Sequence, residues 1–153
     1  MANNCLSHKL MIIAGIDYGL NVGLAIATFS GDTLRRVLLE TYYDGDQEVA
    51  DLVIQNRCEL VAMEDPPYSE LGGSANSFYR ILEILKSKGY EVNSAPPFER
   101  NIVRYLPGIW KPVVHAIKPD MRAWGPKTVH EKDAMGILWY AVLTIMGRAI
   151  RYV

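Results

Sequence analysis

The sequence predicts an α/β fold in which helices cover both faces of a five-stranded mixed sheet. Three apolar segments rich in β-branched and aromatic residues follow one another near the N-terminus, separated by short turns that contain glycine. Further along the chain, short strand-like segments alternate with segments whose apolar residues recur at helical spacing. This order is typical of a sheet packed between two layers of helices.

The first three strands are expected to form an antiparallel meander over Met11–Asp17, Val22–Phe29 and Leu34–Tyr43. Apolar residues at helical spacing indicate the later helices, and prolines or glycines end some of the later segments. These are a helix over Gln47–Asn56, a strand over Glu59–Glu64, a helix from Ser74 or Asn76 to Lys88, a fifth strand over Tyr90–Ala95 and a closing helix over His130–Arg148. The proline-rich segment Pro96–Pro126 has no sustained period, so loops and a short helix around Ile102 are expected.

Size and composition indicate one soluble, intracellular domain over residues 1–153. Half of the residues are hydrophobic and 22% are charged, as in ordinary folded proteins. The apolar stretch Ala134–Met146 is shorter than the roughly 18 residues of a membrane span. The N-terminal apolar run ends in an acid and lacks a secretory cleavage site. Cys5 and Cys58 are expected to be free thiols.

Three acids at the ends of separate apolar segments are the candidate functional residues. Asp17 ends the first strand, Glu64 ends the fourth, and Asp133 lies near the start of the closing helix. Each acid alone is consistent with a structural role at a turn, a strand end or a helix N-terminus. Together they indicate carboxylates that converge on bound divalent cations. Asp65 is expected to point to the opposite face of the sheet from Glu64, because side chains alternate along a strand.

A histidine accompanies the last acid on the same side of its helix. Residues three apart share one helix face, so His130 and Asp133 can address one site while Glu131 points elsewhere.

The ordered set of GIDYG around Asp17, Glu64 before two prolines and the motif His130-x-x-Asp133 resembles the ribonuclease H-like superfamily. Within that superfamily it is most similar to RuvC-type Holliday junction resolvases, whose closing helix resembles HEKDAMGILWYAV in this chain. The resemblance spans nearly the whole chain. It implies a ribonuclease H-like fold and a metal-dependent endonuclease that cuts branched DNA symmetrically as a homodimer.

The resemblance also implies that Asp17, Glu64, His130 and Asp133 are catalytic and bind metal. Two Mg²⁺ ions roughly 3.5 to 4 Å apart would relieve the repulsion among the acids, activate a water and stabilise the leaving oxygen. Asp17 would bridge both ions. Imidazole binds Mg²⁺ less well than carboxylate does, so we expect either tolerance of Mn²⁺ or a role for His130 in handling the proton of the water.

The charge is unevenly distributed, since the chain from Arg80 onward has 12 basic and 6 acidic residues. Basic and aromatic side chains after the fourth strand are therefore candidates for DNA contacts. The candidates are Tyr68, Arg100, Arg104, Lys111, Lys118, Arg122 and Lys127. The family often has a lysine near the metals, and the sequence leaves open whether it is Lys111 or Lys118.

A symmetric junction requires two active sites, so a homodimer is expected. The helix that ends at Lys88 is the candidate interface, through Phe78, Tyr79 and Leu82, although its apolar stripe is equally consistent with core packing.

Two alternative functions remain open from the sequence. GIDYGLNVGLA is also similar to the opening of YqgF-type nucleases, which act in RNA processing. A non-catalytic nucleic-acid-binding module of the same fold is the other alternative. A more remote similarity to actin-like and Hsp70-like ATPases is excluded by length, because those proteins need two such domains.

Overall fold

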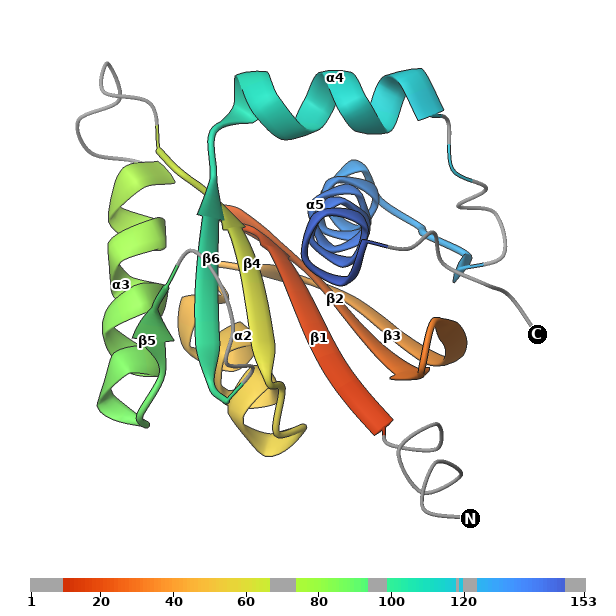
Figure 1. Cartoon of the computed structure of the whole chain (residues 1–153). Coiled ribbons are helices and arrows are strands. Elements are labelled where there is room, and N and C mark those ends of the chain that lie inside the picture. The colour runs from red at the N-terminus through yellow and green to blue at the C-terminus, as the bar shows by residue number, and fades with distance from the viewer. Residues whose placement is uncertain (1–9, 67–73, 94–98, 118, 120–123, 148–153) are drawn as a thin grey trace, which may run out of the picture.

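The computed structural model describes residues 10–66, 74–93, 99–117, 119 and 124–147 (Figure 1). Its strands are β1 (Leu10–Asp17), β2 (Asn21–Ser30), β3 (Thr33–Tyr43), β4 (Leu60–Glu64), β5 (Glu91–Val92) and β6 (Asn101–Tyr105). They form one sheet in the order β3-β2-β1-β4-β6-β5. The expected meander is confirmed, because β2 pairs antiparallel with both β1 and β3. The pairs β1–β4, β4–β6 and β5–β6 are parallel, so the sheet is mixed.

Helices cover both faces of the sheet, as predicted. The helices are α2 (Asp46–Gln55), α3 (Ser74–Ser87), α4 (Pro107–Ile117) and α5 (Val129–Met146). Figure 1 shows α2 and α3 on one side of the sheet and α4 and α5 on the other. Side chains alternate between the two sides. Along β1, Ile13 packs toward α5, whereas Ala14 and Ile16 pack toward α2 and α3.

The expected count of five strands is wrong, because the sheet has six strands within the described residues. Ile102 lies in β6 and not in a short helix. Ile102 and Val103 face opposite sides of the sheet and both are buried, so this strand has no alternating pattern in the sequence. The predicted fifth strand is confirmed only as the two-residue β5, and residues 94–98 lie outside the described part of the chain.

Helix α4 was not predicted. It begins with Pro107 and contains Pro112, and prolines in this segment indicated loops. Proline suits the first helical position because its missing N–H would have no partner there. Buried Trp110 and Val114 attach α4 to the cluster around α5. In the described part of the chain, no helix is long and apolar enough to cross a membrane.

Asn101 is a buried polar residue whose side-chain oxygen and nitrogen have no hydrogen-bond partner within the described structure. An unpaired buried amide costs free energy that an apolar group of the same shape does not. We expect Asn101→Leu to raise the free energy of unfolding by about 1 kcal/mol, measured by urea denaturation. The control is Asn56→Leu, because Asn56 donates to the carbonyl of Leu52 at 2.7 Å. An equal gain in both variants would contradict this explanation.

Candidate functional site

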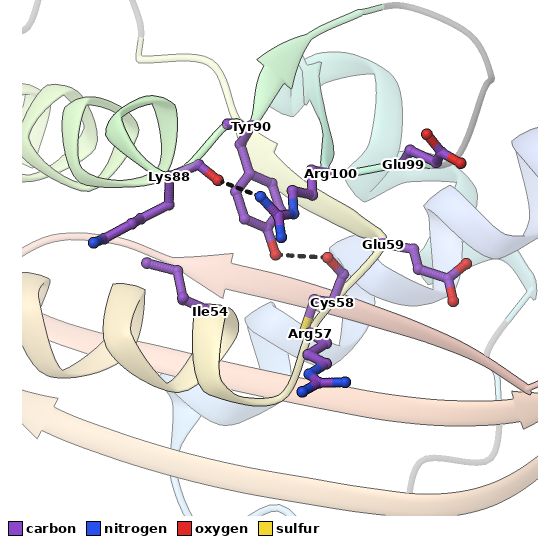
Figure 2. Close-up of a pocket in the computed structure, with 9 residues that line it drawn as sticks. Ile54, Arg57, Cys58, Glu59, Lys88, Tyr90, Glu99 and Arg100 are labelled. Atoms are coloured by element: carbon purple, nitrogen blue, oxygen red, sulfur yellow. Dashed lines mark hydrogen bonds between the residues drawn. The ribbon is translucent and has the colours of Figure 1, made fainter.

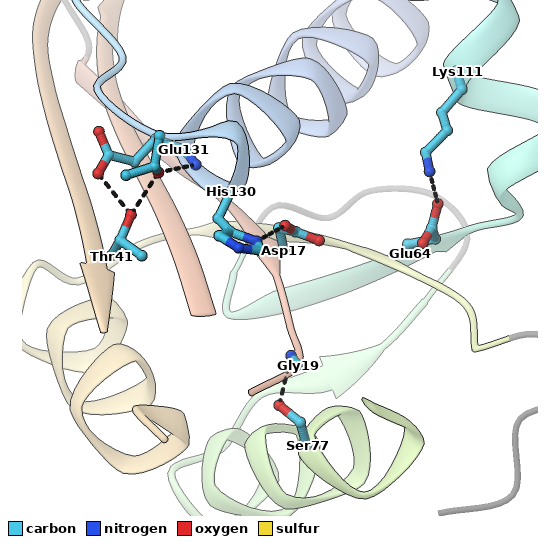
Figure 3. Close-up of polar contacts among 9 residues, drawn as sticks. Asp17, Gly19, Thr41, Glu64, Ser77, Lys111, His130 and Glu131 are labelled. Carbon is cyan, nitrogen blue, oxygen red and sulfur yellow. Dashed lines mark hydrogen bonds and ion pairs between the residues drawn. The ribbon is translucent and has the colours of Figure 1, made fainter. Parts of the chain in front are cut away.

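Asp17 and His130 form the centre of the candidate site. Asp17 is the last residue of β1, and His130 is in the first turn of α5. The Nδ1 atom of His130 lies 3.0 Å from Oδ2 of Asp17, and both side chains are partly exposed (Figure 3). The structure therefore brings together two of the four predicted catalytic residues, which are 113 positions apart in the sequence.

Two glycines allow this contact. In the antiparallel pairing of β1 and β2, Gly23 lies directly opposite Asp17. A Cβ atom on Gly23 would lie 2.2 Å from the carbonyl oxygen of His130, and one on Gly15 would lie 2.2 Å from the carbonyl oxygen of Ala134. The backbone of α5 thus rests directly on the strands, which sets the first turn of the helix against the end of β1.

The surroundings of Asp17 disfavour its negative charge. Burial of the carboxyl is the largest effect and raises the pKa of Asp17 from 3.8 to about 6. The hydrogen bond with His130 acts in the opposite direction, while the negative charges of Asp133 and Glu64 raise the pKa further. The carboxyl groups of the predicted set therefore interact electrostatically, and their repulsion is the kind that a bound cation relieves.

Glu64 lies at the end of β4, next to the end of β1. Ile16 pairs with Met63, so Asp17 and Glu64 are the next residues along two neighbouring strands. The indole N–H of Trp110 donates to Oε1 of Glu64 at 3.0 Å. Nζ of Lys111 lies 3.6 Å from the same oxygen, a contact that Figure 3 shows. Helix α4 thus adds a donor and a cation to the site.

The described side chains do not form a closed metal cage. No group of three or more His, Cys, Asp or Glu residues in these ranges lies close enough together to hold one ion. Asp17 faces His130, while Glu64 faces Trp110 and Lys111. The donor set of carboxylates and one imidazole suits Mg²⁺ or Mn²⁺ in kind.

Glu131 points away from Asp17, as predicted, and is buried. Its backbone N–H donates to Oγ1 of Thr128 at 3.0 Å, and its Oε1 accepts from the backbone N–H of Lys127 at 3.1 Å. Its Oε2 accepts from the hydroxyl of Thr41 on β3 at 2.7 Å. This is a variant of the capping box, and the spacing Thr128-x-x-Glu131 was the sequence signal for it.

A second set of hydrogen bonds holds the turn that follows Asp17. The N–H of Gly19 donates to the hydroxyl of Ser77 on α3 at 3.0 Å, and that hydroxyl donates to Oδ1 of Asp46 at 2.5 Å. Asp46 also accepts from Arg80 at 3.0 Å. Ser77 and Asp46 are buried, and no pattern in the sequence indicated that they meet.

Comparison with solved structures establishes the fold. Thermus thermophilus RuvC in complex with a Holliday junction superposes with a TM-score of 0.66 at 19% identity, covering 92% of this chain and 98% of RuvC. A second structure of Thermus thermophilus RuvC gives 0.59 at 19% identity, covering 92% of this chain and 99% of RuvC. The fowlpox virus Holliday junction resolvase gives 0.53 at 13% identity, covering 88% and 97%.

The chain has the RuvC fold. The predicted resemblance to RuvC-type resolvases is thus confirmed at the level of the fold, as is the ribonuclease H-like architecture. No family model matches the sequence, and no curated protein matches it. The likeness therefore lies mainly in the course of the backbone, because the sequences are only 13 to 19% identical.

The RuvC fold separates the predicted DNA contacts from one another. Lys111 forms an ion pair with Glu64, and Lys127 is exposed just before α5. Arg104 points to the α3 side, where it pairs with Asp65 and lies 5.0 Å above the ring of Phe78. The predicted orientation of Asp65, away from Glu64, is therefore confirmed. Three of the predicted contacts lie outside the described residues: Tyr68, Lys118 and Arg122.

Arg100 lies at the opposite end of the sheet from Asp17, just before β6. It lines a pocket of about 860 Å³ together with Arg57, Cys58 and Tyr90 (Figure 2). Its guanidinium donates to the carbonyl of Lys88 at 2.9 Å. Cys58 is a free thiol, as predicted, and burial raises its pKa to about 12. Cys5 lies outside the described residues.

Helix α3 offers less apolar surface than the sequence suggested. Phe78 and Leu82 are buried in the core between α3 and the sheet, so the expectation that they form an interface is wrong. Their spacing reflects packing within the chain, which was the alternative explanation. Tyr79 is 55% exposed.

Replacing Gly23 tests the packing of α5. We expect Gly23→Ala to push the first turn of α5 away from β2 and lower the free energy of unfolding by about 1 to 3 kcal/mol, measured by urea denaturation. Gly108→Ala is the control, because a Cβ there meets no atom within 4 Å. It should be neutral or stabilising, since alanine favours helix more than glycine does. Equal destabilisation by both changes would contradict the packing argument.

The raised pKa of Asp17 predicts a dependence of stability on pH in metal-free buffer. Between about pH 4 and 6 the folded protein keeps a proton on Asp17 that the unfolded chain has released. The free energy of unfolding should therefore fall as pH rises through this window and level off above it. Asp17→Asn lacks this effect, so relative to wild type it should gain about 2 to 3 kcal/mol between pH 4 and pH 8. Urea denaturation in EDTA measures it, and a difference independent of pH would refute it.

Proposed function

We propose that this chain is a metal-dependent endonuclease that cleaves phosphodiesters in branched DNA, as a Holliday junction resolvase. The observation that carries the proposal is Asp17 held against His130 at the end of the central strand of a RuvC fold. Two of the solved structures with this fold contain Holliday junction DNA, those of Thermus thermophilus RuvC and the fowlpox virus resolvase. The excess of negative charge around Asp17 supports a need for cations.

Asp17, Glu64, His130 and Asp133 would hold the cations, Mg²⁺ or Mn²⁺. When bound, such ions lower the pKa of an attacking water and neutralise charge on the phosphate. The residues of the chain supply the alignment. His130 orients the carboxylate of Asp17 through their hydrogen bond, and Trp110 fixes one oxygen of Glu64.

Lys111 is our choice between the two lysines that the sequence left open. Its Nζ lies 3.6 Å from Glu64, and its side chain is 45% exposed, so it can reach a phosphate that approaches the site. A lysine there provides a positive charge for the DNA backbone without reading its sequence. This suits an enzyme that recognises branched shape.

We further propose that residues 1–153 form one intracellular nuclease domain that works as a homodimer. Two opposite strands of a junction are related by two-fold symmetry, so a dimer can present one site to each strand. Exposed Tyr79 on α3 remains available for that contact.

The test is cleavage of labelled four-way junctions, flaps and single-stranded RNA with Mg²⁺ or Mn²⁺. We expect wild type to make paired symmetric nicks in the junction, and Asp17→Asn to be at least about 100-fold slower because a ligand shared by the cations is lost. The control is Asp51→Asn on α2, on the far side of the sheet.

Other outcomes of the cleavage assay would contradict parts of the proposal. Unchanged cleavage by Asp17→Asn would refute the assignment of Asp17. Cleavage of RNA alone would favour a YqgF-like RNA-processing nuclease, and junction binding without cleavage would favour a non-catalytic module. A gel-filtration mass of one chain at working concentration would contradict the dimer.

A further inference from the structure

Three residues from three neighbouring strands lie in one row beneath the first turn of α5. In the register of the sheet, Gly23 on β2 pairs with Asp17 on β1 and with Thr41 on β3. Directly paired residues point to the same face of a sheet. We call Asp17, Gly23 and Thr41 the seating row.

The first turn of α5 contacts all three members of the seating row. Nδ1 of His130 meets Asp17, the carbonyl of His130 lies over Gly23, and the carboxylate of Glu131 accepts from Thr41. Two successive helical residues are thereby fixed at three points across the width of three strands. Such an arrangement fixes the rotation of the helix about its axis as well as its height above the sheet.

The contact at Thr41 is part of a closed ring of hydrogen bonds. Thr41 donates to Glu131 at 2.7 Å, so its oxygen is free to accept from the hydroxyl of Thr128 at 2.8 Å. The oxygen of Thr128 in turn accepts from the backbone N–H of Glu131 at 3.0 Å. Each hydroxyl donates once and accepts once, which satisfies both of these partly buried groups.

This anchor is needed because the acids of the site act against one another. Asp17 ends β1, Glu64 ends the neighbouring strand β4, and Asp133 lies near the start of α5. Without cations, repulsion between Asp133 and Asp17 favours movement of the first turn away from β1. The hydrogen bond from the uncharged hydroxyl of Thr41 to Glu131 opposes that movement from outside the site.

We propose that Thr41 is a positioning residue: through Glu131 it fixes the rotation of α5 and so the separation between Asp17 and Asp133. The proposal rests on the nuclease function proposed above. If Glu131 served only to cap the helix, loss of the Thr41 hydroxyl would not affect the site. The two capping bonds, from the N–H of Glu131 to Thr128 and from the N–H of Lys127 to Glu131, lie within the start of α5. Thr41→Val leaves those bonds in place and removes the two hydrogen bonds that join the start of α5 to β3, those of Thr41 with Glu131 and with Thr128.

The experiment compares Thr41→Val, Thr41→Ser and wild type. We expect Thr41→Val to cleave four-way junctions about tenfold more slowly in single turnovers, because small misplacements of catalytic groups have large effects on rate. Junction affinity should be unchanged. Binding of Mn²⁺ without DNA, followed by electron paramagnetic resonance, should weaken several-fold. Thr41→Ser keeps the hydroxyl and should restore both properties.

Thr33→Val is the matched control, since it makes the same replacement at the other end of β3. The proposal would be overturned if folded Thr41→Val cleaved junctions and bound Mn²⁺ as well as wild type does. Equal losses of cleavage rate and Mn²⁺ affinity in Thr33→Val would also overturn it. If Thr41→Val does not fold, Thr41→Ala makes the same comparison with a smaller side chain. If wild type cleaves no junction, the proposed function fails, while the Mn²⁺ measurement still decides the role of Thr41.

Discussion

The candidate site depends on the absence of side chains at Gly15 and Gly23. Any Cβ at either position would collide with a carbonyl oxygen of α5, so the helix can lie this low only on bare strand backbone. The low position brings the polar first turn of the helix to the end of β1, where Asp17 emerges from the core. A helix supported on ordinary apolar side chains would lie at the usual separation, and His130 would not reach the carboxylate.

Electrostatic repulsion opposes the assembly of the site, and hydrogen bonds of nearby hydroxyl groups support it. Burial and neighbouring acids make the ionised form of Asp17 unfavourable. Hydroxyl groups nevertheless hold both the turn that follows Asp17 and the helix that faces it. Ser77 holds the following turn through Gly19, and Thr41 holds the facing helix through Glu131. In the proposed nuclease, these contacts would keep like charges close together before cations bind, which is a form of preorganisation.

Local patterns in the sequence predicted the elements that have a clear period or a clear end. The meander was readable from its turns, and Asp17 and Glu64 each end an apolar run. Strand β6 was not readable, because Ile102 and Val103 are buried on opposite faces and leave no alternation. The tie between Thr41 and Glu131 spans 90 positions and depends on the register of three strands, which one sequence does not contain.

The adjacent acids at the end of β4 have separate surroundings. Glu64 meets Trp110 and Lys111 on one face, and Asp65 meets Arg104 on the other. A shift of this strand by one residue would still offer a carboxylate to each face, so charge alone selects neither alignment. The apolar residues of β4 that precede the two acids determine the alignment. A shift by one residue would move each of them to the opposite face of the sheet and so into the wrong half of the core. Deleting a single residue within β4 should therefore leave the acidic character of the strand end intact while abolishing the folded protein.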